Sequence, residues 1–213
     1  MVKKYKTIYA DPPWMEHGAG RIPRGADRHY PLMKTRDIAA LPVKSLIDPE
    51  GAHLYLWTTN NFLRDALEVV RAWGFDYVTM ITWLKDRQGL GQYYRGLTEH
   101  CIFARTPNRL PYKLLDGKRQ QGVTGFCAPK GRHSAKPEEM RRMIERVSYA
   151  PRVELFAREP HAGWDVWGNE IPGAQALLAD FARSLNAMTD AELAKAARQA
   201  RQDSRNSDLM GEG

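Results

Sequence analysis

Short apolar runs alternate with amphipathic stretches along this chain. Six runs rich in β-branched, aromatic and aliphatic residues have the composition of buried strands. They comprise residues 7–10, 53–58, 77–84, 100–104, 153–157 and 164–167. Two stretches between them have the periodicity of amphipathic helices. This recurrence of strand, helix and strand predicts an α/β fold with a mostly parallel sheet and helices on both faces.

The ends of both predicted helices carry sequence signals. Asn60 or Asn61 would cap the first helix, and Gly74 would end it. Its apolar positions are Leu63, Ala66, Leu67, Val70 and Trp73. Pro137 and the two glutamates after it suit the first turn of the second helix. The apolar face of that helix comprises Met140, Met143, Ile144 and Val147.

Three segments, residues 15–33, 85–97 and 106–132, break this pattern and are longer than ordinary connections. Long loops on a rigid α/β core commonly carry function. They concentrate positive charge at Arg21, Arg24, Arg28, Arg87, Arg95, Lys113, Lys118, Arg119, Lys130 and Arg132. Their aromatic residues Tyr30, Tyr93, Tyr94 and Phe126 would stack on bases if the loops bind nucleic acid. The alternative is a solvated surface whose aromatic side chains pack against the core.

Composition narrows the class of protein. The chain has 213 residues, enough for one domain with a large core, and its net charge of +7 suits a polyanionic partner. Cys101 and Cys127 lack metal-type spacing, which predicts a reducing, cytoplasmic location and no metal site. No stretch approaches the about 20 apolar residues of a membrane span, and the first residues lack the apolar run of a signal peptide. A soluble protein without a membrane partner is expected.

The most informative motif is Asp11-Pro12-Pro13-Trp14, which follows the apolar run at 7–10. Proline cannot extend a strand ladder, so the motif places a carboxylate just beyond the carboxyl end of a strand. Ligands bind at that edge of open α/β sheets. A carboxylate, carbonyl groups and a flat aromatic side chain suit an extruded base that carries an amino group. The alternative is a Pro-Pro turn with a buried Trp14.

Two later groups of residues add candidate binding chemistry. Residues 133–137 precede the second helix, where free backbone amides and the Lys136 ammonium would attract a carboxylate. Residues 154–158, His161 and residues 167–170 place hydrogen-bonding groups at the end of another strand, where they suit ribose hydroxyls and an adenine ring. Taken alone, Lys136 reads as a surface residue and His161 as a structural one.

Together these segments resemble the MT-A70 family, the adenine-N6 methyltransferases related to the catalytic subunit of the eukaryotic messenger-RNA adenosine methyltransferase, and in size the chain is similar to small prokaryotic or phage members. The resemblance runs in the family's order over about residues 6 to 171. It rests on residues 9–14, 41–43, 56–58, 133–137, 154–158, 163–164 and 167–170. It implies a Rossmann-like methyltransferase fold with permuted motif order and S-adenosylmethionine as cofactor.

The resemblance also implies roles for individual residues. Asp11, Pro12, Pro13 and Trp14 would form the catalytic motif. The cofactor would be bound by Ala10, Asp11, Lys136, Arg158, His161, Asn169 and Glu170, of which Glu170 replaces an amide of the eukaryotic enzyme. Apart from the resemblance, the charge and aromatic content of the long loops make Arg21, Arg24, Tyr30, Lys118 and Arg119 candidate contacts to nucleic acid, together with Trp14 of the motif.

The expected chemistry follows from the substrate. The exocyclic nitrogen of adenine is a poor nucleophile because its lone pair is delocalised into the ring. Acceptors at its two hydrogens, the Asp11 carboxylate and the Pro12 carbonyl, would favour the reactive tetrahedral form, and Asp11 would stabilise the positive charge that develops. Pro13 would shape the turn, and Trp14 or a nearby aromatic side chain would stack on the base.

Several alternatives stay open. A catalytically silent nucleic-acid-binding subunit of the same fold is one, although the intact motif at 11–14 favours an active enzyme. Methylation of the N4 amino group of cytosine is another, because it uses the same acceptor logic. The absence of an attached RNA-binding module favours DNA over RNA as the substrate.

The chain is expected to divide into a methyltransferase domain, residues 1–173, and a helical extension, residues 174–213, with a disordered end. The extension has an apolar stripe at Ala174, Leu177, Leu178, Phe181 and Leu185. Such a stripe packs either on the protein's own sheet or on a second copy or partner subunit.

We expect deletion of residues 204–213 to leave activity intact, because that segment is largely polar. Deletion from residue 174 onward should lower solubility, because it exposes the surface that the apolar stripe covers. Light scattering on both truncations tests this. A well-behaved, fully active monomer that ends at Gly173 would contradict it.

Overall fold

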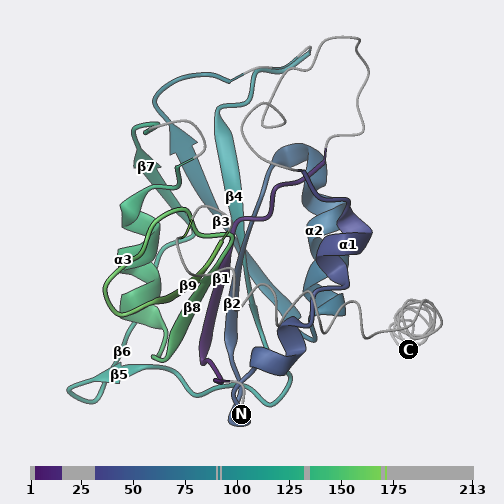
Figure 1. Cartoon of the computed structure of the whole chain (residues 1–213). Coiled ribbons are helices and arrows are strands. Elements are labelled where there is room, and N and C mark those ends of the chain that lie inside the picture. Colours follow the sequence, from purple (N-terminus) through teal and green to yellow (C-terminus); the bar gives the residue numbers. More distant parts are fainter. Residues whose placement is uncertain are drawn as a thin grey trace, which may run out of the picture.

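The computed structural model describes residues 3–15, 32–89, 91, 93–131, 135–168 and 171. Among them, seven strands form one sheet in the order β7-β3-β4-β2-β1-β8-β9 (Figure 1). Their bounds are β1 (Thr7–Ala10), β2 (His53–Thr58), β3 (Asp76–Lys85), β4 (Thr98–Arg105), β7 (Gly125–Ala128), β8 (Arg152–Leu155) and β9 (Asp165–Trp167). Only β4 runs antiparallel to its neighbours within this sheet. The predicted mostly parallel α/β sheet is confirmed.

Helices cover both faces of the sheet (Figure 1). One face carries α1 (Thr35–Ala39) and α2 (Leu63–Ala72), together with the 3₁₀ turns η2 (Val43–Leu46) and η3 (Asn60–Phe62). The other face carries α3 (Glu138–Val147). Each of the two longer helices turns an apolar stripe inward, and the buried members are Ala66, Val69 and Val70 of α2 and Met140 and Ile144 of α3.

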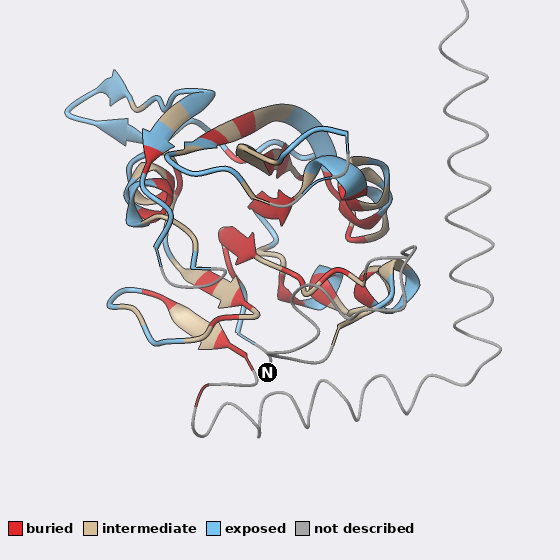
Figure 2. Ribbon diagram, turned by 90° about the horizontal axis from the view of Figure 1, so that it is seen from above, coloured by how far each residue is buried: buried red, intermediate tan, exposed pale blue. Residues whose placement is uncertain are grey.

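The sheet therefore separates two apolar cores, and the buried positions concentrate on its strands and on the inner faces of the helices (Figure 2). Alternate residues of β1 supply both cores: Ile8 and Ala10 face α1 and α2, whereas Tyr9 faces α3. β1 is buried along its whole length, as is usual for a strand with parallel neighbours and helices on both faces. Its sequence accordingly contains no charged side chain.

Two local expectations are wrong. Neither Asn60 nor Asn61 caps α2 with its side chain, because both lie in η3, one turn before the helix. The side-chain oxygen Oδ1 of Asn60 instead lies 2.7 Å from His100 Nε2. Segment 106–132 is not a plain loop: it contains β7 and the small hairpin of β5 (Leu114–Leu115) and β6 (Lys118–Arg119). Strands of two residues have no alternation from which they could be predicted.

The order of the strands identifies the edge where a ligand would bind. β1 pairs in parallel with β2 on one side and with β8 on the other. The chain leaves β1 through α1 toward β2 on one face, and it reaches β8 through α3 on the opposite face (Figure 1). The carboxyl ends of β1 and β8 thus form a topological switch point, which is where open α/β sheets bind ligands.

Two further expectations concern a membrane span and the division of the chain into domains. Among the residues described, no helix is long and apolar enough to cross a membrane. The proposed domain boundary at 173 and the extension 174–213 lie outside the described residues.

His53 and Tyr55 of β2 form a buried polar cluster with Ser148, which follows α3, and this cluster should make the stability of the fold depend on pH. His53 Nδ1 and Tyr55 Oη both lie 2.8 Å from the Ser148 hydroxyl. Burial, assisted by the Arg105 charge, lowers the pKa of His53 to about 4. Between this value and about 6.5, the unfolded chain binds more protons than the folded protein, so stability falls as pH falls.

We expect His53 to contribute a loss of at most about 3 kcal/mol in the free energy of unfolding between about pH 7 and about pH 4. Urea denaturation of the wild type and of His53→Gln at both pH values measures this contribution. The variant should lose less stability on acidification. Equal losses in the two proteins would show that His53 does not titrate with unfolding.

Candidate active site

The carboxylate of Asp11 stands at the switch point. Ala10, the last residue of β1, lies between Leu56 and Leu155 in the sheet and is fully buried. The Asp11 amide still reaches the Leu155 carbonyl at 3.5 Å, and the two prolines then end the ladder. The Asp11 side chain retains 24% exposure. It is therefore held by the sheet yet accessible to a ligand.

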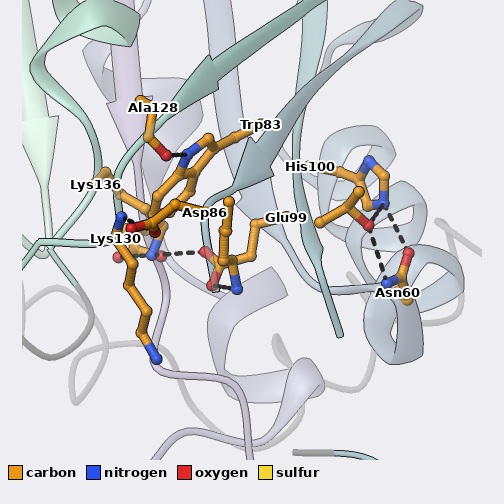
Figure 3. A network of polar contacts seen from close by, with 11 residues as sticks. Asn60, Trp83, Asp86, Glu99, His100, Ala128, Lys130 and Lys136 are labelled. Atoms are coloured by element: carbon orange, nitrogen blue, oxygen red, sulfur yellow. Dashed lines mark hydrogen bonds and ion pairs between the residues drawn. The ribbon is translucent and has the colours of Figure 1, made fainter. Parts of the chain in front are cut away.

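Four side chains of alternating charge meet at this edge. Lys136 Nζ lies 2.6 Å from Asp11 Oδ2 and 3.5 Å from Glu99 Oε2. Lys85 Nζ lies 2.7 Å from Glu99 Oε1. Figure 3 shows Glu99 and Lys136 approaching each other at the end of the sheet. The segment just after β1, the strands β3 and β4, and the segment before α3 each contribute one member, so the cluster forms only when these elements are assembled.

A layer of buried indole rings supports both lysines. Lys136 Nζ lies 5.4 Å from the centroid of the Trp57 ring, and Lys85 Nζ lies 5.5 Å from that of Trp83. The two rings contact each other edge to face at 6.2 Å. Their N–H groups donate to the Tyr9 hydroxyl and to the Ala128 carbonyl, respectively. These contacts restrict the lysine side chains to the rim of the sheet.

Burial and ion pairing act in opposite directions on the two carboxylates. Burial raises the pKa of Asp11 above its usual value, and the Lys136 ammonium opposes the increase. Burial also penalises the charge of Glu99, but Lys136 and Lys85 outweigh that penalty, so the pKa of Glu99 is lowered. Glu99 is thus a stable anion, whereas the charge on Asp11 depends on Lys136.

Trp14 anchors the motif instead of offering a free face. It is 8% exposed, stacks on Phe62 with ring centroids 5.7 Å apart, and donates from Nε1 to the Trp57 carbonyl at 3.1 Å. The expected stacking of Trp14 on a base does not agree with this packing. The Pro12 carbonyl accepts from the Trp14 amide at 2.9 Å, and one of its two lone pairs is left for a further donor.

The end of β8 supplies the second side of the site. Phe156 adopts a left-handed φ of 64°, which turns the chain sharply after the strand. A Cβ on Gly168 would lie 1.7 Å from the Ala157 carbonyl oxygen. Only glycine at position 168 therefore allows the backbone there to lie so close to Ala157. Arg158 and His161 lie on it, and the Arg158 charge is near enough to act on the pKa of Asp11.

The remaining candidates divide into two groups. Lys118 and Arg119 lie on β6, at the opposite end of the sheet from Asp11 (Figure 1), and Arg119 stacks 3.7 Å over the Tyr112 ring. The structure does not bring them to the site. Arg21, Arg24, Tyr30, Asn169 and Glu170, and His133 and Ser134 of the motif before α3, lie outside the described residues.

Glu99 and Lys85 are the site residues that sequence reasoning missed. Each charge stands at a strand end, where polar residues are common, and neither belongs to a recognisable motif. The signal in the sequence was weak: Glu99 is a single charged residue directly before the strand-like run at 100–104. In the described part of the chain, no group of three or more His, Cys, Asp or Glu side chains could hold a metal ion.

Comparison with known proteins shows which family and which individual proteins this sequence resembles. A profile of the family described as MT-A70 matches residues 5–170. The type II methyltransferase M.MunI of Mycoplasma is 30% identical over 190 residues, covering 80% of this chain and 79% of the relative. A probable N(6)-adenosine-methyltransferase MT-A70-like protein of rice is 31% identical over 185 residues, covering 81% of this chain and 24% of its own. The human N(6)-adenosine-methyltransferase catalytic subunit METTL3 is 28% identical over 186 residues, which cover 82% of this chain and 29% of the human protein.

The ion pair generates a prediction about Asp11. Replacing Lys136 with Met removes the charge that opposes burial, so the pKa of Asp11 should rise further above its usual value. Carbon-13 NMR titration of the side-chain carboxyl groups measures it, with Asp11→Asn to assign the signal. Lys130→Met is the matched control, because the exposed Lys130 contacts Asp86 through its backbone amide only. An unchanged Asp11 titration in Lys136→Met would contradict the pairing.

Proposed function

The chain belongs to the MT-A70 family, whose methyltransferases depend on S-adenosylmethionine, and we propose that it transfers a methyl group to the N6 amino group of adenine in nucleic acid, preferably DNA. The observation that carries the proposal is the Asp11 carboxylate at the switch point, ion-paired to Lys136 at 2.6 Å. It combines a hydrogen-bond acceptor for an amino group with a cation for the cofactor at one edge of the sheet.

The side chains at this edge fit the cofactor's chemistry. Its methionine carboxylate needs a cation, and Lys136 has three N–H donors, so it can exchange its longer contact, 3.5 Å to Glu99, for that carboxylate. Its ribose hydroxyls need donors and acceptors, which Arg158 and His161 supply at the turn after β8. Among the expected binding residues, Ala10 gives β1 a small, apolar and fully buried end next to Asp11.

The proposed mechanism depends on acceptors placed before the reaction. The Asp11 carboxylate accepts one hydrogen of the adenine amino group, and the Pro12 carbonyl accepts the other with its remaining lone pair. These two bonds favour the tetrahedral nitrogen, whose lone pair then points away from them. When bound, S-adenosylmethionine supplies an electrophilic methyl group. Asp11 stabilises the positive charge that develops on the nitrogen, more strongly because partial burial excludes water.

The other expected residues take supporting roles in this proposal. Pro13 and Trp14 hold the position of the motif, since the Pro13 carbonyl accepts from the Met33 amide at 2.8 Å and Trp14 packs in the core. Lys136 keeps Asp11 ionised. Glu99, bound to both lysines, positions Lys136.

The similarity to the bacterial relative favours DNA. The bacterial relative, named a type II methyltransferase, is covered over 79% of its length, whereas the rice protein is covered over only 24%. The chain is thus similar in extent to an enzyme class that modifies DNA. Its net charge of +7 suits either nucleic acid. Cytosine N4 is the competing acceptor, and a catalytically silent subunit is the competing class; the intact Asp11–Lys136 pair supports the active enzyme.

Mass spectrometry of nucleosides tests the proposal directly. The protein is incubated with isotopically labelled S-adenosylmethionine and with DNA or RNA, and the nucleosides are then separated. Labelled N6-methyladenine from DNA is the expected product. Label in RNA would change the substrate, label in cytosine would change the base, and no label in any nucleic acid would favour the silent subunit.

We expect Asp11→Asn to lower the methylation rate by about 10²- to 10³-fold with the fold retained, because it removes an anionic acceptor from the transition state. Asp76→Asn is the matched control, since Asp76 is exposed at the start of β3, at the other end of the sheet. Single-turnover kinetics and circular dichroism measure rate and fold. A folded Asp11→Asn protein with nearly normal turnover would remove Asp11 from the mechanism.

A further inference from the structure

The connection between β3 and β4 presents two unusually exposed aromatic side chains. Tyr93 is 94% exposed and Tyr94 is 91% exposed, more than any other large hydrophobic side chain in the described part of the chain. An isolated exposed aromatic residue needs no explanation, but two adjacent ones, almost entirely in solvent, form a surface that suits a partner. The connection rises beyond the end of the sheet at which β1 ends (Figure 1).

Backbone contacts hold the two tyrosines away from the core. The Lys85 amide donates to the Leu97 carbonyl at 2.9 Å, and the Gly89 amide donates to the Gly96 carbonyl at 2.7 Å. The two sides of the connection thus stay in contact beyond the strands, with three extra residues, 86–88, on the β3 side. A Cβ on Gly91 would lie 1.9 Å from the Tyr94 carbonyl oxygen. Glycine at 91 therefore permits a tight approach that only a bare backbone can make, and the tyrosines project from it.

The charge of this hairpin favours a polyanion as the partner. Between residues 87 and 97 the charged residues are Arg87 and Arg95, and there is no acidic residue. Asp86, at the foot of the hairpin, is engaged: its carboxylate accepts from the Lys130 amide at 2.7 Å and contacts Arg87 Nε at 3.3 Å. Aromatic rings among cations, without acids, are the combination that holds nucleic-acid strands.

The foot of the hairpin belongs to the candidate active site. Lys85 pairs with Glu99, and Glu99 is linked through Lys136 to Asp11.

A pocket lies beside the same foot. Its volume is about 360 Å³, and its walls are mostly apolar with one charge of each sign. The lining residues are Leu84, Lys85, Asp86, Cys127, Ala128 and Pro129.

We propose that Tyr93 and Tyr94 form a stacking platform for bases of the nucleic-acid substrate that flank the target adenine. This inference rests on the proposed function for the class of substrate. The platform holds the strand by its bases while Arg87 and Arg95 contact phosphates, and the target nucleotide is thereby aligned over Asp11. Because every base has a π face, the platform tolerates any sequence at these positions.

The test is binding of fluorescent single-stranded DNA, measured by anisotropy without cofactor. Tyr93→Ala/Tyr94→Ala should weaken binding by about tenfold or more, given the usual contribution of base stacking. Tyr93→Phe/Tyr94→Phe should bind like the wild type, because the rings remain. Tyr77→Ala/Tyr112→Ala is the matched control: these exposed tyrosines lie at the other end of β3 and beside β5. It should also bind like the wild type.

Oligonucleotide length provides a second arm. The loss in the alanine variant should shrink and then disappear as the DNA is shortened stepwise toward the target adenine, since DNA that no longer reaches the platform cannot stack on it. Equal affinity of the wild type and the alanine variant for long DNA would overturn the inference, as would equal losses in the control variant. A change of oligomeric state confined to the alanine variant would also overturn it, in favour of a protein partner.

These outcomes separate the platform from the proposed function. A wild type that binds DNA through the tyrosines but yields no labelled nucleoside would contradict the methyltransferase assignment and leave the platform intact. A wild type that methylates adenine while the alanine variant binds and reacts equally well would contradict only the platform.

Discussion

The contact between Asp11 and Lys136 is the constraint on which the site depends. The two residues are 125 positions apart in the chain, and both side chains are largely shielded from water, at 24% and 15% exposure. An unpaired charge in such a position is costly, so each residue needs the other. The pair forms only if the end of β1 and the segment before α3 reach the same edge of the sheet.

The rest of the fold secures that meeting. β1 lies in the middle of the sheet between two parallel partners, and α3 is held on β8 by Arg141, whose guanidinium pairs with Glu154 at 2.8 Å. The indole layer under Lys136 and Lys85 connects this pair to the core. Glu99 completes the charge balance: with Asp11 it supplies two negative charges for two positive ones.

Sequence patterns predicted much of this arrangement, and physical reasons explain the rest. The strand before Asp11 and the helix after Pro137 follow from local periodicity and capping chemistry. The contact between Asp11 and Lys136 was not predicted, because no local rule relates residues so far apart. Glu99 and Lys85 were missed because a charge at a strand end usually faces solvent. Trp14 was expected on the ligand side, but the nearby Phe62 and the Trp57 carbonyl give it better contacts inside. Lys118 and Arg119 were grouped with the site by charge alone.

A double-mutant cycle on methylation kinetics tests most directly whether Asp11 and Lys136 act as one unit. The values of kcat at saturating S-adenosylmethionine, which leave out the separate role of Lys136 in binding the cofactor, are compared for the wild type, Asp11→Asn, Lys136→Met and the double variant. If the main task of Lys136 is to keep Asp11 ionised and in place, the double variant should be about as slow as Asp11→Asn alone, so the two losses are strongly non-additive. Losses in free energy that simply add would contradict the account, because they would show that each residue acts without the other.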